Sequence, residues 1–176
     1  MKAPEVKKPE VKRPEGKGVR MRRVAIWAGL TFALDQATKW AVVQWLNLKD
    51  IGEYDLFDPF LVFRMAWNRG VNFGLLSSDS DVTRWILIAL ALGISAWVVI
   101  WVRREGGKWA EISAGLLVGG ALGNVVDRLV YGAVADFLNM SCCGIENPFS
   151  FNIADVAIFA GALGLVLFTG TRGKTA

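Results

Sequence analysis

Residues 109–131 read WAEISAGLLVGGALGNVVDRLVY, an apolar stretch that decides the class of fold. A helix needs about 20 mostly apolar residues to cross the roughly 30 Å hydrocarbon core of a bilayer, and this stretch is long enough. Small residues recur within it at intervals of four, at Gly115, Gly119 and Gly123, with Gly120 beside them. Such spacing lets two helix backbones approach closely in lipid. We therefore predict a membrane-spanning helix that packs tightly against a second one.

Further apolar stretches of similar kind flank this one, and together they predict an all-α polytopic membrane protein. With 53% apolar residues and a mean hydropathy of +0.38, the chain of 176 residues is too apolar for a soluble surface. The four predicted transmembrane helices cover residues 24–46, 82–102, 109–131 and 152–169. Ala157 with Gly161, and Ala160 with Gly164, repeat the small-residue pattern in the last span. We therefore expect the third and fourth spans to pack together.

The basic residues give the orientation of these spans. Nine of the 20 Lys and Arg residues precede Val24, three lie within residues 103–108, and two follow the fourth span. The positive-inside rule then places both termini in the cytoplasm. The segments 47–82 and 132–151 fall outside, and strand-prone residues in the first of them predict a small extracytoplasmic β cradle.

The predicted membrane domain covers residues 24–170 and lies between two cytoplasmic tails, residues 1–23 and 171–176. Residues 3–17 read APEVKKPEVKRPEGK and contain few large apolar groups, so we expect a disordered basic tail. The first apolar stretch is too long for the apolar region of a signal peptide, which predicts that this span is retained. At the start of the second span, Asp79 offers a side chain that can cap the helix.

The chain contains no histidine and two cysteines, the adjacent pair Cys142 and Cys143. By itself it cannot build Ser–His–Asp or Cys–His catalysis, a His-ligated zinc site or a His-ligated haem site. Adjacent cysteines rarely bridge each other without strain, so we expect free thiols or partners for another chain.

Ionisable and amide side chains within the spans are the candidates for chemistry. A charge at the bilayer centre costs about 2.5–3.5 kcal/mol, so each one needs a partner or a role. These residues all lie toward the outer side of the predicted spans: Asp35, Lys39, Asn124, Asp127, Arg128, Asp136, Asn152 and Asp155. Asp35 and Lys39 are four residues apart and are expected to form an intrahelical ion pair, whereas Asp127 and Arg128 can neutralise one another or neighbouring backbone groups.

Asp136 and Asp155 have no obvious cation nearby in the sequence, which favours a catalytic role for both. The third span runs outward and the fourth inward, so both carboxylates reach a similar level near the outer boundary. Two such carboxylates in a poorly solvated site share one proton. One then takes a proton from water while the other polarises a scissile carbonyl group. The sequence therefore predicts a water-activating peptidase site that needs no metal, with Asn124 and Arg128 orienting the pair.

Five polar stretches lie along the chain in this order: Asp35-Gln-Ala-Thr-Lys39, Asn68-Arg-Gly-Val-Asn-Phe73, Gly119-Gly-Ala-Leu-Gly-Asn-Val-Val-Asp-Arg128, Val134-Ala-Asp-Phe137 and Phe151-Asn-Ile-Ala-Asp155. Together, and in this order, they resemble the lipoprotein signal peptidase family, also called signal peptidase II. The resemblance covers roughly residues 24–170. The chain departs from the family at Val71 and Asn72, where two small residues are more usual.

The resemblance implies an aspartic endopeptidase of the bacterial inner membrane. Such an enzyme removes the signal peptide from diacylglyceryl-modified prolipoproteins, cutting just before the lipidated cysteine, and is inhibited by globomycin-type cyclic peptides. The resemblance implies that Asp136 and Asp155 are catalytic, on the outer face of the membrane. The residues implied to support or line the site are Asp35, Lys39, Asn68, Gly70, Gly120, Asn124, Arg128 and Asn152.

The expected partners are lipidated signal peptides and membrane lipids. We expect no metal, cofactor or nucleic acid partner, and we expect a monomer.

Three other activities remain open on the residues alone. A transporter or proton conductor would also place acids within spans, although the inner halves here hold few polar groups. A metal-dependent phospholipid headgroup transferase would gather Asp127, Asp136 and Asp155 around divalent ions. A Ser–Lys peptidase would use Lys39 as the base and a loop serine such as Ser141 as the nucleophile.

Overall fold

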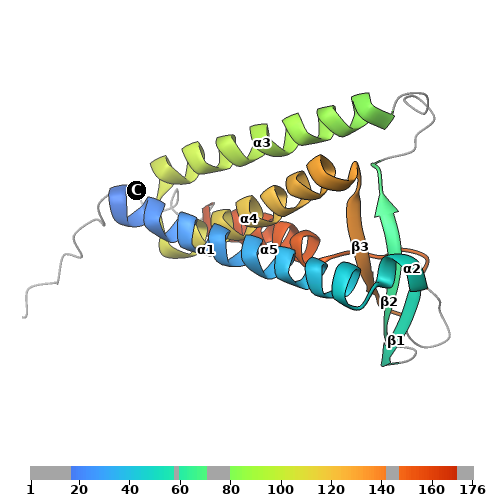
Figure 1. Cartoon of the computed structure of the whole chain (residues 1–176). Coiled ribbons are helices and arrows are strands. Elements are labelled where there is room, and N and C mark those ends of the chain that lie inside the picture. The colour runs from blue at the N-terminus through green and yellow to red at the C-terminus, as the bar shows by residue number, and fades with distance from the viewer. Residues whose placement is uncertain (1–16, 58–59, 71–79, 142–146, 170–176) are drawn as a thin grey trace, which may run out of the picture.

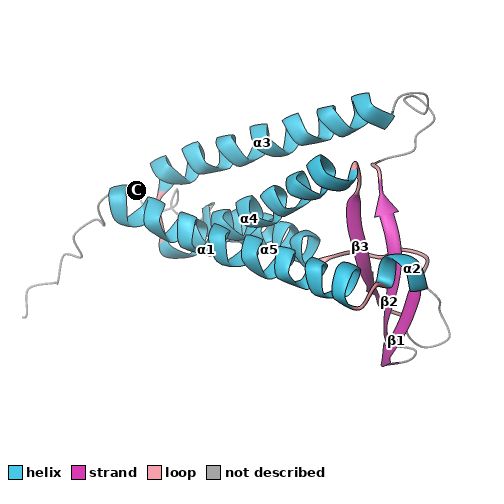
Figure 2. Ribbon diagram, in the orientation of Figure 1, coloured by secondary structure: helices cyan, strands magenta, loops and turns pink. Residues whose placement is uncertain are grey.

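A bundle of long helices carries a small sheet at one end in the computed structural model of the chain (Figure 1, Figure 2). The structure describes residues 17–57, 60–70, 80–141 and 147–169. Its elements in chain order are α1 (Lys17–Lys39), η1 (Trp40–Trp45), α2 (Leu48–Ile51), β1 (Glu53–Phe57), β2 (Leu61–Asn68), α3 (Ser80–Glu105), α4 (Lys108–Tyr131), β3 (Val134–Asn139) and α5 (Ile153–Thr169). The mostly helical fold predicted from the sequence is confirmed.

The long helices fall on the predicted apolar stretches but differ from them at the ends. Helix α1 begins at Lys17, so the last part of the tail predicted to be disordered is helical, and it continues directly into the π-helical segment η1. Among the described residues, Asp81–Arg104 and Lys108–Tyr131 form the two helices that are long and apolar enough to cross a membrane. Helix α5 is apolar but shorter, at 17 residues.

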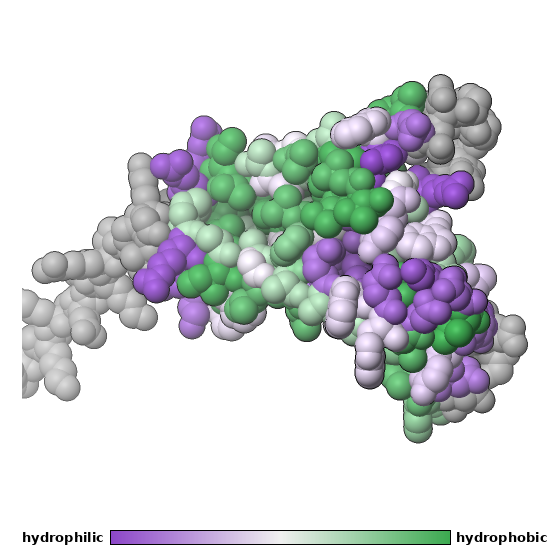
Figure 3. Space-filling model, in the orientation of Figure 1, coloured by the Kyte–Doolittle hydropathy of each residue, from purple (hydrophilic) through white to green (hydrophobic). Residues whose placement is uncertain are grey.

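Successive long helices run in alternating directions (Figure 1). Helices α1 and α4 run toward the sheet, whereas α3 and α5 run away from it, so Lys17 and Thr169 lie at the end of the bundle opposite the sheet. The surface between the two ends is largely apolar, with hydrophilic residues gathered at both ends (Figure 3). Large exposed apolar side chains on this surface include Leu30, Leu34, Trp85, Leu90, Trp97, Phe159 and Val166. An apolar surface of this extent is typical of a protein in contact with lipid.

Helix α4 is the central element, and its glycines face two different neighbours. A Cβ atom at Gly120 would lie 2.5 Å from the Ala154 carbonyl oxygen on α5, and one at Gly119 would lie 2.5 Å from the Ala28 carbonyl oxygen on α1. The predicted close packing of α4 on α5 is confirmed, and Gly161 on α5 contributes to it. The four-residue glycine stripe itself faces α1, because Gly120 is offset from that stripe around the helix.

The three strands form an antiparallel sheet in the order β1-β2-β3. Strands β1 and β2 lie in the segment for which the sequence predicts a β cradle. Strand β3 is not predicted, because nearly all of its residues are buried and the sequence lacks the alternation that marks a strand. It pairs with β2, so that Asp136 lies opposite Ala66.

Phe137 fixes the orientation of β3 next to the site. Its side chain is buried in an apolar cluster with Val42 and Leu48, and its ring meets the edge of Phe63 at a centroid distance of 5.8 Å. Side chains alternate between the two faces of a strand, so anchoring Phe137 in this cluster turns Asp136 to the opposite face.

Several features predicted from the sequence lie outside the described residues. These are residues 1–16 of the tail, Val71 and Asn72, the capping residue Asp79, and the pair Cys142 and Cys143.

Candidate active site

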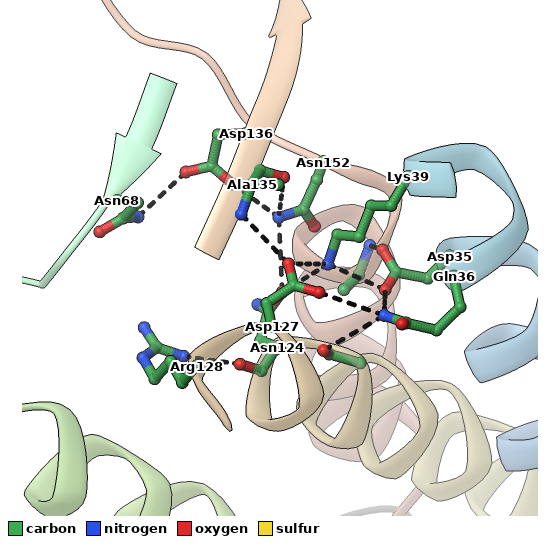
Figure 4. Close-up of polar contacts among 12 residues, drawn as sticks. Asp35, Gln36, Lys39, Asn68, Asn124, Asp127, Arg128, Ala135, Asp136 and Asn152 are labelled. Carbon is green, nitrogen blue, oxygen red and sulfur yellow. Dashed lines mark hydrogen bonds and ion pairs between the residues drawn. The ribbon is translucent and has the colours of Figure 1, made fainter. Parts of the chain in front are cut away.

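The candidate site lies where the last turns of α4, the strand β3, the start of α5 and helix α1 meet, at the sheet end of the bundle (Figure 4). Polar side chains from all four elements converge there in a closely connected set of hydrogen bonds and ion pairs. Most of these side chains are buried, which is unusual for charged groups unless they are paired.

Asp136 projects from β3 and accepts hydrogen bonds on both carboxylate oxygens. Asn152 Nδ2 donates to its Oδ1 atom at 2.6 Å, and Asn68 Nδ2 donates to its Oδ2 atom at 3.0 Å (Figure 4). Burial, followed by the nearby charge of Asp155, raises the pKa of Asp136 to about 7, against the opposing effects of the two amides and of Lys39. Asp136 therefore holds a proton near neutral pH far more readily than an ordinary aspartate.

Asp155 lies in the first turn of α5 and forms a reciprocal cap with Asn152. The Asn152 main-chain N–H donates to Asp155 Oδ2 at 3.1 Å, and the Asp155 N–H donates to Asn152 Oδ1 at 2.9 Å. This is the geometry of a capping box, with asparagine and aspartate in the two positions. Asn124 Nδ2 on α4 donates to the other carboxylate oxygen at 2.9 Å.

Asn152 thus connects the two aspartates predicted to be catalytic. Its side chain is fully buried and donates to Asp136, while its main chain donates to Asp155. The structure brings Asp136, Asp155, Asn124 and Asn152 together as the sequence predicts.

The predicted Asp35–Lys39 ion pair is present, with an Nζ–Oδ2 distance of 2.9 Å. Lys39 also contacts Asp127 Oδ2 at 2.8 Å, so the ion pair of Asp127 is with α1 and not with Arg128. Asp127 also accepts the main-chain N–H of Ala135, in line with the backbone partner that the sequence left open. Gln36 Nε2 donates to Asp35 at 3.1 Å and to Asp127 at 3.2 Å (Figure 4). A buried cluster of two carboxylates and one ammonium therefore lies directly beneath the site.

Asn68 and Gly70 form a small turn at the end of β2. The Gly70 N–H donates to Asn68 Oδ1 at 3.0 Å, which orients the amide so that Nδ2 faces Asp136. Gly70 has φ +108°, a conformation that disfavours any residue with a Cβ atom. A Cβ atom there would also lie 2.6 Å from Leu87 Cδ1.

Gly120 and Arg128 lie beside the site on helix α4. Gly120 lies one turn before Asn124 and lets α5 approach closely enough for Asn124 to reach Asp155. Arg128 donates to the Asn124 carbonyl oxygen at 3.4 Å. A cavity of about 220 Å³ lies between α3 and the α4–α5 pair, lined by Leu87, Leu90, Ala91, Ile94, Leu117, Ala121, Asn124, Arg128 and Ile158. The cavity is apolar except at Asn124 and Arg128.

Comparison with known proteins identifies the family. The family model described as signal peptidase (SPase) II matches residues 27–170. The chain belongs to the signal peptidase II family. The lipoprotein signal peptidase of Methylorubrum extorquens is 42% identical over 137 residues, which cover 78% of this chain and 79% of the relative. That of Aeromonas hydrophila is 39% identical over 142 residues, covering 80% and 83%.

Two solved structures titled as bacterial membrane enzymes share the fold. One has a TM-score of 0.68 at 24% identity and covers 90% of this chain and 94% of its own. The other has a TM-score of 0.70 at 22% identity and covers 88% and 94%. Membership of the signal peptidase II family makes the chain a peptidase of a membrane enzyme family.

Sequence reasoning missed one polar contributor, and the ion-pair partner of another, in this member of the signal peptidase II family. Gln36 was not singled out, although its place one residue after Asp35 gives it access to the same helix neighbours. Asp127 was a candidate residue with Arg128 or neighbouring backbone groups as its expected partners, whereas its ion pair is with Lys39. The sequence did hold a signal for this second partner. A lysine within a span has three N–H donors, and Asp35 alone does not satisfy all of them, so a further carboxylate was to be expected.

Proposed function

We propose that this chain is an aspartic endopeptidase that removes the signal peptide from diacylglyceryl-modified bacterial prolipoproteins, cutting just before the lipidated cysteine. The observation that carries the proposal is the position of Asn152, which donates to Asp136 through its side chain and to Asp155 through its main chain. One buried residue thereby contacts both carboxylates of the proposed pair, which supports a shared action on one water. The family and the names of the relatives supply the substrate class.

Asp136 is the proton-holding member of the proposed pair, and Asp155 is the base. Burial raises the pKa of Asp136 to about 7, so that it can hold a proton near neutral pH, whereas Asp155 accepts hydrogen bonds from Asn152 N and Asn124 Nδ2. Asp155 takes a proton from water, the water oxygen attacks the scissile carbonyl carbon, and Asp136 donates a hydrogen bond to the carbonyl oxygen. The tetrahedral intermediate then collapses as Asp155 returns the proton to the leaving nitrogen. No step of this scheme uses a metal or a cofactor.

The apolar cavity between α3 and the α4–α5 pair supports a lipidated substrate. It reaches Asn124, whose amide touches Asp155, so a group held there lies beside the reacting bond. At about 220 Å³ it is smaller than the roughly 300–1,000 Å³ of a typical site for a drug-sized ligand. We expect it to take a segment of one acyl chain.

The proposed setting is the bacterial inner membrane, crossed four times by a monomeric chain with both termini in the cytoplasm. The alternating directions of α1, α3, α4 and α5 support this topology. Arg103, Arg104 and Lys108 lie at the end of the bundle opposite the sheet, where the positive-inside rule expects them. The active site then faces the outer side of the membrane.

The test is cleavage of a diacylglyceryl-modified prolipoprotein by purified protein in detergent with excess chelator. Asp136→Asn and Asp155→Asn are each expected to lower kcat by about 100- to 10,000-fold, the usual contribution of a general acid or base. Asp50→Asn is the matched control, because Asp50 is an exposed aspartate in α2. Size-exclusion profiles and thermal unfolding establish that each variant is folded.

Each outcome of this test decides between mechanisms. Loss of cleavage in both folded variants, with the control active, supports the aspartic pair. Full activity in either variant contradicts it. Activity of the wild type that disappears with chelator contradicts the metal-free scheme, and an inactive wild type contradicts the substrate assignment.

A further inference from the structure

Asp35, Lys39 and Asp127 form a buried cluster next to the proposed catalytic pair. Among the described contacts, none of the three is hydrogen-bonded or ion-paired to the carboxylate of Asp136 or Asp155. The carboxyl groups of Asp35 and Asp127 are 0% and 1% exposed as side chains, and Lys39 Nζ lies between them at 2.9 Å and 2.8 Å. Burying three charges is costly unless their geometry is good and their hydrogen bonds are satisfied. The remaining contacts of the cluster indicate what it does.

Each carboxylate of the cluster accepts the main-chain N–H of the residue immediately before one of the proposed catalytic aspartates. Asp127 Oδ2 accepts from Ala135 N at 3.1 Å, directly before Asp136. Asp35 Oδ1 accepts from Ala154 N at 3.0 Å, directly before Asp155. The cluster therefore holds β3 and the start of α5 by the same kind of charge-assisted hydrogen bond.

We call the hydrogen bonds from Ala135 N to Asp127 and from Ala154 N to Asp35 the two anchors of the site. Lys39 contacts both of these carboxylates and also Asn124. Its Nζ atom donates to Asn124 Oδ1 at 3.1 Å, and Asn124 Nδ2 donates to Asp155. The three hydrogens of the ammonium thus have three acceptors. Ala135 and Ala154 are fully buried and have no polar side chain that could set the position of their backbone instead.

We propose that Asp127 and Asp35 are positioning residues that, tied together by Lys39, set the separation of Asp136 and Asp155. The proposal rests on the proposed function, since it assigns a role relative to that catalytic pair. Loss of one anchor shifts one aspartate relative to the other and slows the step they share. Misplacement by about 1 Å can cost on the order of 100-fold in rate. The effect is therefore expected in kcat and not in KM.

The experiment compares Asp127→Ala with Asp127→Asn in the cleavage assay. Asparagine keeps an oxygen that can accept from Ala135 N, whereas alanine does not. We expect about a 100-fold lower kcat for Asp127→Ala, with KM within about twofold, and recovery to within about tenfold of the wild type in Asp127→Asn. The same pair of substitutions at Asp35 tests the anchor before Asp155.

Glu111→Ala is the matched control. Glu111 is also a buried carboxylate of α4 that contacts a basic residue of α1 and accepts a main-chain N–H, but at the opposite end of the helix. A purely structural role for Asp127 predicts the same loss of stability and the same small change in kcat for both alanine variants. A positioning role predicts a large loss of kcat for Asp127→Ala alone.

Wild-type kcat in Asp127→Ala, or a loss in folded Asp127→Asn as large as 100-fold, overturns the proposal. If Asp127→Ala does not fold, the nearly isosteric Asp127→Asn still gives this second test. Failure of the proposed function is distinguishable, because it leaves the wild type inactive or the Asp136→Asn variant active.

Discussion

The two ends of the contact between α1 and α4 use similar ion pairs for different purposes. At the far end, Arg23 Nη1 lies 2.9 Å from Glu111 Oε2, and Glu111 also accepts from Gly107 N, just before the first residue of α4. At the sheet end, Lys39 lies between Asp35 and Asp127, and both carboxylates hold the chain beside the proposed catalytic pair. The two ends therefore differ in the main-chain N–H groups that their carboxylates accept, and not in their ion pairs. At the far end the accepted N–H belongs to the start of a helix, whereas at the sheet end the accepted N–H groups lie next to the proposed catalytic aspartates.

The largest expected effect is on stability, and removing the basic side chain at each end of the α1–α4 contact tests it. Lys39→Met leaves two buried carboxylates facing each other, so we expect a loss of about 3–5 kcal/mol in the free energy of unfolding. Arg23→Met should cost less, because the Arg23 side chain is 27% exposed and the Glu111 carboxylate keeps the hydrogen bond from Gly107 N. Thermal unfolding in detergent measures both. Equal losses would show that the two ends are energetically alike.

Substituting glycines along the α4–α5 contact separates stability from activity. Gly120→Ala and Gly161→Ala each place a Cβ atom within 2.5–2.6 Å of main-chain atoms, so each should destabilise by about 1–3 kcal/mol. Only Gly120 lies against Ala154, and we expect kcat to fall further in Gly120→Ala. Gly93→Ala is the control, since its Cβ atom meets nothing within 4 Å. An equal fall in kcat for Gly120→Ala and Gly161→Ala would contradict the local role of Gly120.

The smallest expected effect is a shift in the pH profile. Cleavage requires the proton on Asp136, so kcat/KM should fall above about pH 7 as Asp136 ionises. The Asn68 amide favours the ionised form, so its removal in Asn68→Ala should move this fall to higher pH. The other charges that act on Asp136 are those of Asp155, Lys39 and Arg128, which stay in place.

Arg23→Met provides the far-end control for the pH profile, which we expect to remain at its wild-type position. A profile that is flat between pH 6 and 9, or one that moves to lower pH in Asn68→Ala, contradicts the assignment of the proton to Asp136.

The sequence by itself determined the membrane class of the protein, the apolar stretches that become its long helices, and the polar residues within the spans that are candidates for chemistry. These follow from the length and polarity of continuous segments, and the Asp35–Lys39 pair follows from the helix repeat, so all of them are local properties. Asn68, Gly70 and Gly120 were implied as site residues by the resemblance to the family alone. Only the tertiary structure decided that Asp136 lies on a strand, that the glycine stripe of α4 faces α1, and that Lys39 pairs with Asp127. Each of these depends on which distant segments pack together. Packing between distant segments is set by the shapes and charges of whole surfaces, and the spacing of residues along one segment does not record it.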